Sequence, residues 1–281
     1  MAEQARLRAV TLNLWGEQGP LERRLQLCIE QLRELDPDVV ALQEVREIPS
    51  KLANTAQQLG TALGLTPVFA PATEWGGGTE GLAILSRHPI TAHEHVELPQ
   101  PRTDERRVLL WAELATPHGV VLVGTTHLHY RMTDGIAREE QVEAIDRLLK
   151  GQAQKLAGGP KLTVLMGDFN ATPDSDEVRF LRGLHTLGGR RTYYQDAFLC
   201  AHDGPVDHGF TWSRRNPYTQ RLRFLQNDRR LDYIFVSPPS RDGRGVVHSC
   251  RVVLDRPDPD GVFPSDHFGL LAELQLSPLS R

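Results

Sequence analysis

Acidic, amide and imidazole side chains recur in this sequence next to short apolar runs. In chain order they are Asn13, Glu44, His127, Asp168, Asn170, Asp232, Asp266 and His267. Because strand ends project into the loops where layered α/β proteins build their sites, we expect these side chains to gather. Carboxylate and amide oxygens with two imidazoles suit magnesium or manganese and phosphoryl transfer better than a zinc site.

Each motif alone also has a structural interpretation. The segment Gly167-Asp168-Phe169-Asn170 can bind a hard cation, hold a water or contact phosphate, and it can equally be an Asx turn that closes a strand. Glu44 can be a surface carboxylate just past its strand. Neighbouring strand residues point to opposite faces, so Asp232 can orient His267 where the adjacent Asp266 need not. His127 and His129 are spaced for one strand face, but no third soft ligand favours zinc.

Short apolar runs and helical periodicities alternate over the whole chain. Strands are expected at Leu7–Leu14, Val39–Leu42, Thr66–Ala70, Gly81–Ser86, Ile90–Leu98, Val108–Leu114, Val120–His127, Leu162–Met166, Leu231–Val236, Val246–Leu254 and Phe268–Leu276. Helices are expected at Leu21–Leu35, Ser50–Leu63 and Thr133–Lys150, with long loops and short strands over 183–228. Mixed strands with helices outside predict an α/β (α+β) protein of two packed sheets flanked by helices. No linker interrupts the pattern, so we expect a single domain, 1–281.

The composition excludes several classes of protein. Of 281 residues, 40% are hydrophobic and 24% are charged, which is typical of globular chains and not of disordered or fibrous ones. No apolar run approaches the roughly 20 residues of a membrane helix. Because residues 1–8 are short and polar before the first apolar run, we expect no leader. We therefore expect a cytoplasmic protein without stable membrane insertion or an evident obligate protein partner. The three cysteines, Cys28, Cys200 and Cys250, are expected to be core residues of a reduced protein.

Positive charge is concentrated in one segment. The formal net charge of the chain is −4, but residues 179–230 hold ten arginines, four aspartates and neither lysine nor glutamate, a local charge of +6. A net negative charge argues against coating nucleic acid through bulk positive charge. An arginine-rich segment beside acidic metal ligands nevertheless suits a polyanionic ester, so any such attraction is local.

Taken together, the motifs resemble those of the endonuclease/exonuclease/phosphatase family, the deoxyribonuclease I-like metal-dependent phosphoesterases. The matching segments are Thr11-Leu12-Asn13, Leu42-Gln43-Glu44-Val45, Gly81-Leu82-Ala83-Ile84-Leu85-Ser86-Arg87, Thr126-His127-Leu128, Gly167-Asp168-Phe169-Asn170, Arg230-Leu231-Asp232-Tyr233-Ile234-Phe235 and Ser265-Asp266-His267. The resemblance implies a four-layer sandwich of two packed mixed β-sheets flanked by helices. It also implies hydrolysis of a phosphate ester by in-line attack of a metal-activated water.

The resemblance also implies a role for each residue. Glu44 and Asn13 would bind the metal, and Asp266 would complete its site or support the water. Asp168 and Asn170 would orient the water and the scissile phosphate. His267, held by Asp232, would act in acid/base chemistry or stabilise the charged phosphorane. His127, oriented by Glu80, would bind a non-bridging phosphate oxygen.

Three further residues are candidates for substrate binding. Arg106, in the pair Arg106-Arg107, can contact phosphate from the start of a strand, although an exposed basic strand start explains the pair equally well. Trp212 and Asn216 resemble a loop that flanks the active site in relatives. Trp212 can stack on a base or sugar, or simply pack.

Departures from the family pattern indicate which branch of the family the chain resembles, but they do not identify the substrate. Trp15 stands where the apurinic-site endonuclease branch has an aspartate, and His127 where that branch has a tyrosine. The histidine pair looks more like the deoxyribonuclease I and neutral sphingomyelinase side. We expect a magnesium-dependent phosphodiesterase, with manganese or calcium as alternatives. The substrate is expected to be nucleic acid or a small phosphodiester, and the alternative activities are those of a phosphomonoesterase or a sphingomyelinase-like lipid-headgroup phosphodiesterase. A catalytically dead binding module would have lost core groups that this chain retains.

Overall fold

Two six-stranded mixed sheets form the centre of the molecule. The computed structural model describes residues 5–101, 105–202, 208–220 and 227–279. The first sheet has the order β11 (Val247–Val253), β12 (Gly269–Gln275), β1 (Arg6–Asn13), β2 (Val39–Glu47), β4 (Gly78–Ser86) and β3 (Thr66–Trp75). The second has the order β5 (Ile90–Glu97), β6 (Val108–Thr116), β7 (Gly119–His127), β8 (Leu162–Asp168), β10 (Asp232–Val236) and β9 (Gln195–Asp196).

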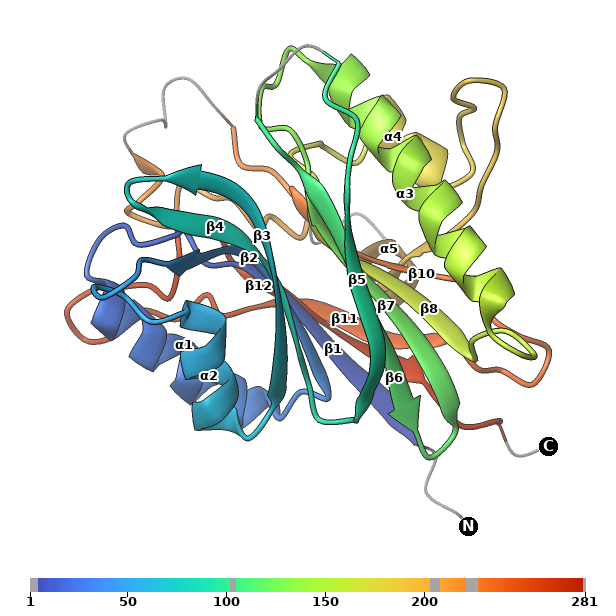
Figure 1. Ribbon diagram of the computed structural model, residues 1–281, viewed down its shortest axis with the longest axis horizontal. Helices are drawn as coiled ribbons and strands as arrows, with labels where there is room; N and C mark the ends of the chain where they lie inside the picture. Colours follow the sequence, from blue (N-terminus) through green and yellow to red (C-terminus); the bar gives the residue numbers. More distant parts are fainter. Residues whose placement is uncertain (1–4, 102–104, 203–207, 221–226, 280–281) are drawn as a thin grey trace.

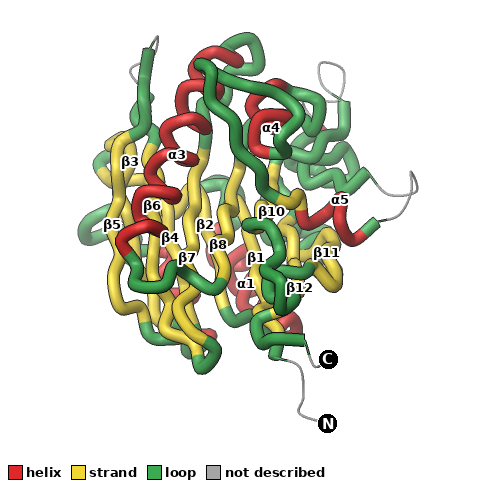
Figure 2. Tube along the Cα trace, turned by 90° about the vertical axis from the view of Figure 1, so that its right-hand side faces the viewer, coloured by secondary structure: helices red, strands yellow, loops and turns green. Residues whose placement is uncertain are grey.

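Helices cover the outer face of each sheet and complete four layers (Figure 1). The helices α1 (Leu21–Leu35) and α2 (Thr55–Leu63) lie on the first sheet. The helices α3 (Gly135–Lys155) and α4 (Asp176–Leu181) lie on the second, and Figure 2 shows α3 running along that sheet. A short helix, α5 (Ala197–Ala201), follows β9. The predicted class, two packed mixed sheets flanked by helices, is confirmed.

Alternate residues of the central strands face two different cores. In β1, Leu7 and Ala9 belong to the core between the sheets, whereas Val10 and Leu12 belong to the core under α1 and α2. Because both faces of these strands are buried, their sequences read as nearly continuous apolar runs. A one-residue slip would exchange the two faces of the strand, so this packing fixes where each strand ends.

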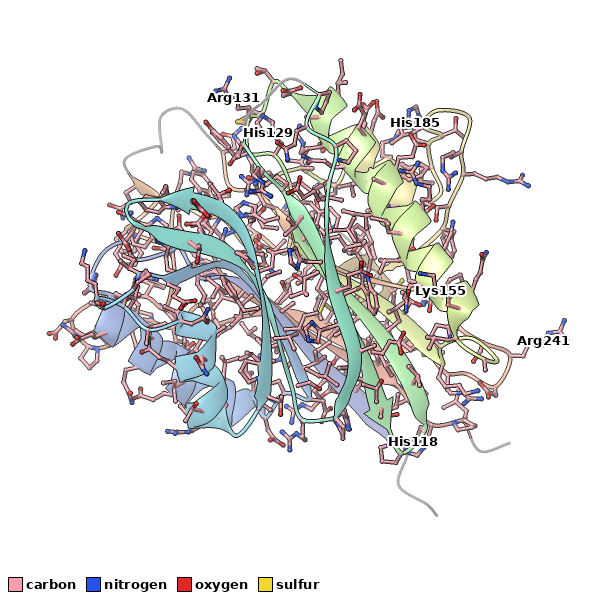
Figure 3. All side chains as sticks on the ribbon, viewed as in Figure 1. His118, His129, Arg131, Lys155, His185 and Arg241 are labelled. Atoms are coloured by element: carbon pink, nitrogen blue, oxygen red, sulfur yellow. The ribbon has the colours of Figure 1, made fainter. Side chains whose placement is uncertain are left out.

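The parallel strand pairs bring the polar strand ends to one edge. Strand β1 pairs in parallel with β2, with Asn13 opposite Gln43, and β7 pairs in parallel with β8, with His127 opposite Asp168. Asp168 is also opposite Asp232 in the antiparallel pair of β8 and β10. His129 follows β7 at this end of the molecule, while His118 precedes β7 at the other end (Figure 3).

Several details differ from the prediction. Strands β2 and β3 continue to Glu47 and Trp75, beyond the expected ends at Leu42 and Ala70, so Glu44 lies within its strand and not after it. The second helix begins at Thr55 and not at Ser50, because the Asn54 side chain caps it by accepting hydrogen bonds from the N–H groups of Ala56 (3.1 Å) and Gln57 (3.2 Å). The helix α4 was not predicted. The segment 183–228 contains α5 as well as β9, and its residues 203–207 and 221–226 lie outside the described part of the chain. Cys28 and Cys250 are buried as expected, but Cys200 is exposed.

Among the described residues, no helix combines the length and apolar character needed to cross a membrane.

Candidate active site

Asn13 links the two sheets at the shared edge. Its side-chain Nδ2 donates to Glu44 Oε1 (2.9 Å) and to Asp168 Oδ2 (3.1 Å), while its Oδ1 accepts the backbone N–H of Trp15 (2.9 Å). The side chain is almost completely buried. The amide oxygen, which the metal-ligand role would use, therefore points toward Trp15, and the amide nitrogen holds two carboxylates at a fixed separation.

Glu44 is turned into the site by an irregularity in β2. The register between β2 and β4 shifts between Leu42 and Val45, and Glu44 adopts φ +52°, a left-handed conformation that costs a residue with a Cβ roughly 1–2 kcal/mol. Its neighbour across the site is Glu80. Burial and the negative charge of Glu44 raise the pKa of Glu80 to about 7. Two carboxylates in this relation favour a bound cation, which would remove their repulsion.

Trp75 and Arg46 hold Glu80 in place. The indole Nε1 of Trp75 donates to Glu80 Oε2 (3.3 Å). The fully buried guanidinium of Arg46 lies 3.8 Å from the Trp75 ring centre and donates to the Trp75 carbonyl (3.0 Å) and to Glu17 (3.3 Å). The hairpin between β3 and β4 is thereby attached to the acidic end of the site.

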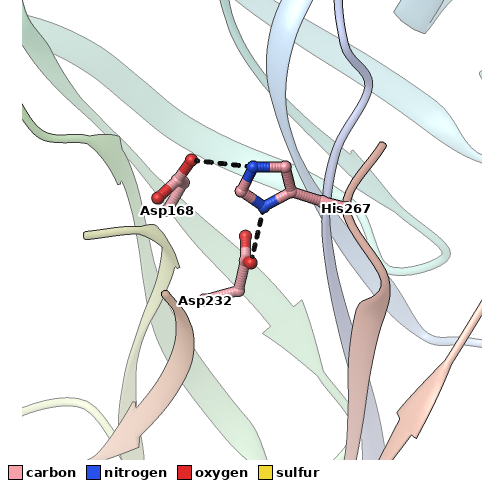
Figure 4. A group of neighbouring side chains, drawn as sticks. All are labelled: Asp168, Asp232 and His267. Atoms are coloured by element: carbon pink, nitrogen blue, oxygen red, sulfur yellow. Dashed lines mark hydrogen bonds and ion pairs between the residues drawn. The ribbon is translucent and has the colours of Figure 1, made fainter. Parts of the chain in front are cut away.

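An imidazole lies between two aspartates on the opposite side (Figure 4). His267 Nδ1 is 2.8 Å from Asp232 Oδ2, and His267 Nε2 is 3.8 Å from Asp168 Oδ2. Burial alone would lower the pKa of His267, but Asp232 and Asp168 together raise it well above the usual histidine value. The Oδ1 atom of Asp232 is buried without a hydrogen-bond partner among the described residues. This contact agrees with the prediction that Asp232 can orient His267 where the adjacent Asp266 need not.

The Asp168–Asn170 segment is an Asx turn and part of the site at once. The N–H of Asn170 donates to Asp168 Oδ1 (2.8 Å), and Asn170 Nδ2 donates to the Leu128 carbonyl (3.0 Å). Only glycine fits at position 167, because its φ is +145° and an added Cβ would lie 2.0 Å from the Thr126 carbonyl oxygen. Burial, followed by the charge of Asp232, raises the pKa of Asp168 to about 7.

His127 contacts Asp168, and its predicted partner does not contact it. Its Nε2 is 3.4 Å from Asp168 Oδ2. In the described part of the chain, no hydrogen bond joins it to Glu80, which accepts from Trp75 instead. Burial, with Arg107 and His267 nearby, lowers the pKa of His127 well below the usual value. The expectation that Glu80 orients His127 is therefore corrected: Glu80 belongs beside Glu44.

The arginine that faces the site is Arg107 and not Arg106. Arg106 is exposed and pairs with Glu97, whereas Arg107 is buried and lines a small pocket with Glu44, Glu80 and His127. Adjacent residues in extended chain point in opposite directions, so only one member of the pair can face inward. Arg107 is held by an ion pair to Glu105.

Residues 265–267 are fixed from two directions. Ser265 Oγ donates to the Asn13 carbonyl (2.6 Å), and Asn216 Nδ2 donates to the Ser265 carbonyl (2.7 Å). Burial, opposed in part by His267, raises the pKa of Asp266 to about 6, and the charge of Glu44 adds to the rise. Asn216 is wholly buried, so it positions this segment and does not touch substrate.

Trp212 is likewise a packing residue. It is 6% exposed, and its backbone pairs with Arg229. The neighbouring Thr211 accepts, through its hydroxyl, the N–H groups of Leu231 (3.0 Å) and Asp232 (3.2 Å). The sequence singled out Trp212 as flanking the site, and in the structure its neighbour Thr211 supports the backbone of Asp232.

The two spaced histidines do not form a metal pair. Strand β7 ends at His127, and the fully buried His129 lies with its Nδ1 2.9 Å from Glu105 and its Nε2 3.5 Å from Asp134. Glu105 therefore connects His129 to Arg107. Glu105, Arg107, Trp75, Arg46 and Ser265 were not assigned site roles from the sequence, and of these only Arg107 and Ser265 lie in segments that the sequence had marked.

Comparisons with known proteins agree with this fold. Protein angel of Drosophila melanogaster is 30% identical over 58% of this chain and 47% of its own length. Nocturnin of the same species is 26% identical over 92% of this chain and 42% of its own length. The chain therefore spans less than half of each of these curated relatives. A truncated Caenorhabditis elegans TDP2 structure superposes with a TM-score of 0.74 at 20% identity, over 96% of this chain and 98% of that one. An endonuclease/exonuclease/phosphatase structure from Bacteroides vulgatus gives a TM-score of 0.72 at 19% identity, over 97% and 100%. These likenesses confirm the deoxyribonuclease I-like fold.

The model of one family, described as "Endonuclease/Exonuclease/phosphatase family", matches residues 10–267. The match includes every residue from Asn13 to His267 that the motifs singled out. The chain therefore belongs to the endonuclease/exonuclease/phosphatase family, whose hydrolases act on phosphodiester bonds.

Proposed function

We propose that this protein is a magnesium-dependent phosphodiesterase. The observation that carries the proposal is the convergence of two carboxylates, Glu44 and Glu80, and an Asp168–His267–Asp232 triad on one buried edge shared by both sheets. The combination provides an anionic cation site beside a cationic imidazole. Such a pairing suits a phosphate group, which a cation and an imidazolium can hold from two sides.

The side chains fit a hard divalent cation. Glu44, Glu80 and Asp266 supply carboxylate oxygens, the donors that magnesium prefers, and no cysteine joins them. Burial raises the pKa of Glu80 to about 7 and that of Asp266 to about 6, with Glu44 contributing to both shifts. When bound, the cation would neutralise charge on the phosphate and would make a coordinated water more acidic. Manganese and calcium are alternatives with the same donor preference.

The protein residues supply positioning and proton transfer. Asp168, whose Oδ2 lies near both imidazoles, accepts a proton from the attacking water, and Asn170 helps to orient that water and the phosphate. His267, kept protonated by Asp232 and Asp168, donates to a phosphate oxygen as negative charge develops there. His127 and Arg107 supply further hydrogen-bond donors from the pocket beside Glu44.

A substrate panel tests the proposal. The protein is assayed with magnesium or with EDTA on bis-p-nitrophenyl phosphate, p-nitrophenyl phosphate, p-nitrophenyl phosphorylcholine, and single-stranded and duplex oligonucleotides. We expect magnesium-dependent cleavage of diesters, and loss of that cleavage in Asp168→Asn. The matched control is Asp260→Asn, an exposed aspartate that pairs with Arg23. Cleavage of the monoester alone would contradict the proposal, as would inactivity of folded protein with magnesium, manganese and calcium.

A cytoplasmic location and a single domain over 1–281 remain predictions. Support for the second comes from the core between the sheets, to which strands from both halves of the chain contribute.

A further inference from the structure

A cleft of about 560 Å³ opens beside the reaction centre. It lies between the segment that follows β8 and the segment that precedes β10. One wall begins at Thr172, two residues after Asn170, and the other contains Arg229, three residues before Asp232. A ligand in this cleft would therefore lie near the segments that carry Asn170 and Asp232. The volume is in the range of sites for small organic ligands.

Two arginines in the cleft lack a carboxylate partner among the described residues. Arg182 donates to the Pro173 carbonyl (3.2 Å), and Arg229 donates to Met132 Sδ (3.0 Å). Partial burial lowers the pKa of Arg229, and no neighbouring carboxylate opposes that shift. A guanidinium group without a carboxylate partner can bind a phosphate through charge-assisted hydrogen bonds.

Most of the other charged groups that line the cleft form ion pairs. Arg179 pairs with Asp176 (2.6 Å), and Arg230 makes a buried ion pair with Asp196 (2.7 Å). Asp228 is held by Arg214 (3.0 Å). Asp174 is the carboxylate that offsets part of the positive charge of the cleft.

The cleft also presents an aromatic surface. The rings of His208 and Phe210 are stacked, with centroids 5.0 Å apart and planes 14° from parallel. Leu184 extends this surface and is 56% exposed. A flat ring beside guanidinium groups that have no carboxylate partner in the described part of the chain matches the two parts of a nucleotide, a base that stacks and a phosphate that carries charge.

We propose that this cleft binds one unpaired nucleotide of a single-stranded nucleic acid, next to the scissile phosphate. Arg182 and Arg229 bind the flanking phosphate, and the base stacks on the surface formed by Phe210 and His208. A base within a duplex cannot reach this surface without leaving its own stack. The proposal names the substrate of the phosphodiesterase site proposed above. It rests on that function, because the position of the scissile phosphate sets the orientation of the bound nucleotide.

Binding of fluorescein-labelled pentanucleotides in EDTA tests the cleft without cleavage. The DNA arm is dA5, the RNA arm is the corresponding ribonucleotide, and the third arm is a GC-rich DNA hairpin whose stem stays paired at the assay temperature. We expect Arg182→Gln and Arg229→Gln each to weaken single-strand affinity about tenfold and to reduce the salt slope by about 0.7. Replacing the ring by Phe210→Leu should weaken it about fivefold or more, because stacking on an aromatic ring contributes roughly 1–3 kcal/mol per base.

Arg241→Gln is the matched control, because Arg241 is exposed and does not line the cleft. Figure 3 shows its side chain extending away from the molecule. Variants whose thermal unfolding matches the wild type, but whose affinity stays within twofold of it, would overturn the proposal. Equal losses on duplex and single strand, or wild-type protein that binds no single strand, would also overturn it. If the wild type binds through the cleft but cleaves no diester, the proposed activity fails and the cleft stands. If the wild type cleaves bis-p-nitrophenyl phosphate but the variants bind normally, the cleft proposal fails and the activity stands.

Discussion

Asp168 is the residue on which the polar contacts of the site converge. It accepts from Asn13 Nδ2 (3.1 Å) and from the N–H of Asn170 (2.8 Å), and it lies 3.4 Å from His127 and 3.8 Å from His267. Both sheets and both imidazoles are therefore related through one carboxylate. A single substitution at Asp168 should affect chemistry more than stability, because Asn13, Asn170 and His267 keep their contacts to Glu44, Leu128 and Asp232.

The first residue-level prediction concerns His267. Replacing it by glutamine removes the cationic donor that Asp232 and Asp168 maintain, and kcat on a small diester should fall by about 10²–10⁴. Steady-state kinetics with magnesium measure this loss, and circular dichroism checks the fold. His95→Gln, at an exposed position of β5, is the matched control. A loss below tenfold would show that His267 takes no part in the chemistry.

A second prediction concerns the support of Glu80. Trp75→Phe keeps a ring over Arg46 but removes the indole N–H that Glu80 accepts. Losing such an outer hydrogen bond typically weakens metal affinity about 10–100-fold. Calorimetric titration with magnesium measures the change, and Tyr193→Phe, an exposed aromatic position, is the control. Unchanged affinity would mean that Glu80 does not bind the metal.

Residue identities were easier to predict than residue partners. The sequence predicted Asp168, Asp232 and His267 as site residues, because carboxylates and imidazoles next to strand-like apolar runs can be recognised in a sequence. The choice between Arg106 and Arg107 depends on which way the chain turns before β6, and the partner of Glu80 depends on a hairpin that crosses over it. Neither relation has a local sequence signal.

At the scale of elements, the parallel pairs β1–β2 and β7–β8 position the site. Strands buried on both faces produced long apolar runs, so most strands and both long helices were predicted close to their observed bounds. The short helices α4 and α5 were not predicted, and β9 was expected only as one of the short strands within 183–228, because such short elements give too little periodicity. The Asp196 side chain, which caps α5 and pairs with Arg230, fixes that region through a contact distant in sequence.

The start of α2 provides an element-level prediction. Asn54→Ala removes the side chain that accepts from Ala56 and Gln57, and the free energy of unfolding should fall by about 1 kcal/mol. Urea denaturation measures this loss, with the exposed Gln57→Ala as the matched control. Equal stability of Asn54→Ala and wild type would show that the helix does not depend on this cap.

At the scale of the whole molecule, the site lies where the two sheets meet. Its acidic groups come from β2, β4 and the segment before β12, so a cation bound by them would join parts of the fold that are distant in sequence. The packing of two sheets was predictable from the short apolar runs that alternate with helical periodicities along the chain. The relative placement of their edges was not, because it depends on the register of β1 against β2 and of β7 against β8.

Magnesium should therefore stabilise the fold. At a concentration 100-fold above its Kd, a ligand that binds only the folded state adds about 2.7 kcal/mol, which differential scanning calorimetry detects as a higher Tm. EDTA should reverse the rise, and Glu44→Gln should abolish it. Glu74→Gln, at an exposed position of β3, should retain it. An identical rise in Glu44→Gln would place the cation elsewhere.

The most direct measurement is the hydrolysis of bis-p-nitrophenyl phosphate by EDTA-stripped protein as magnesium is added back. We predict that activity is absent without metal and returns saturably with it. We also predict that Glu44→Gln, folded by circular dichroism, stays at least about 100-fold less active at the same magnesium concentration. Hydrolysis that is indifferent to EDTA, or a Glu44→Gln variant as active as the wild type, would contradict a metal-dependent phosphodiesterase site at this edge.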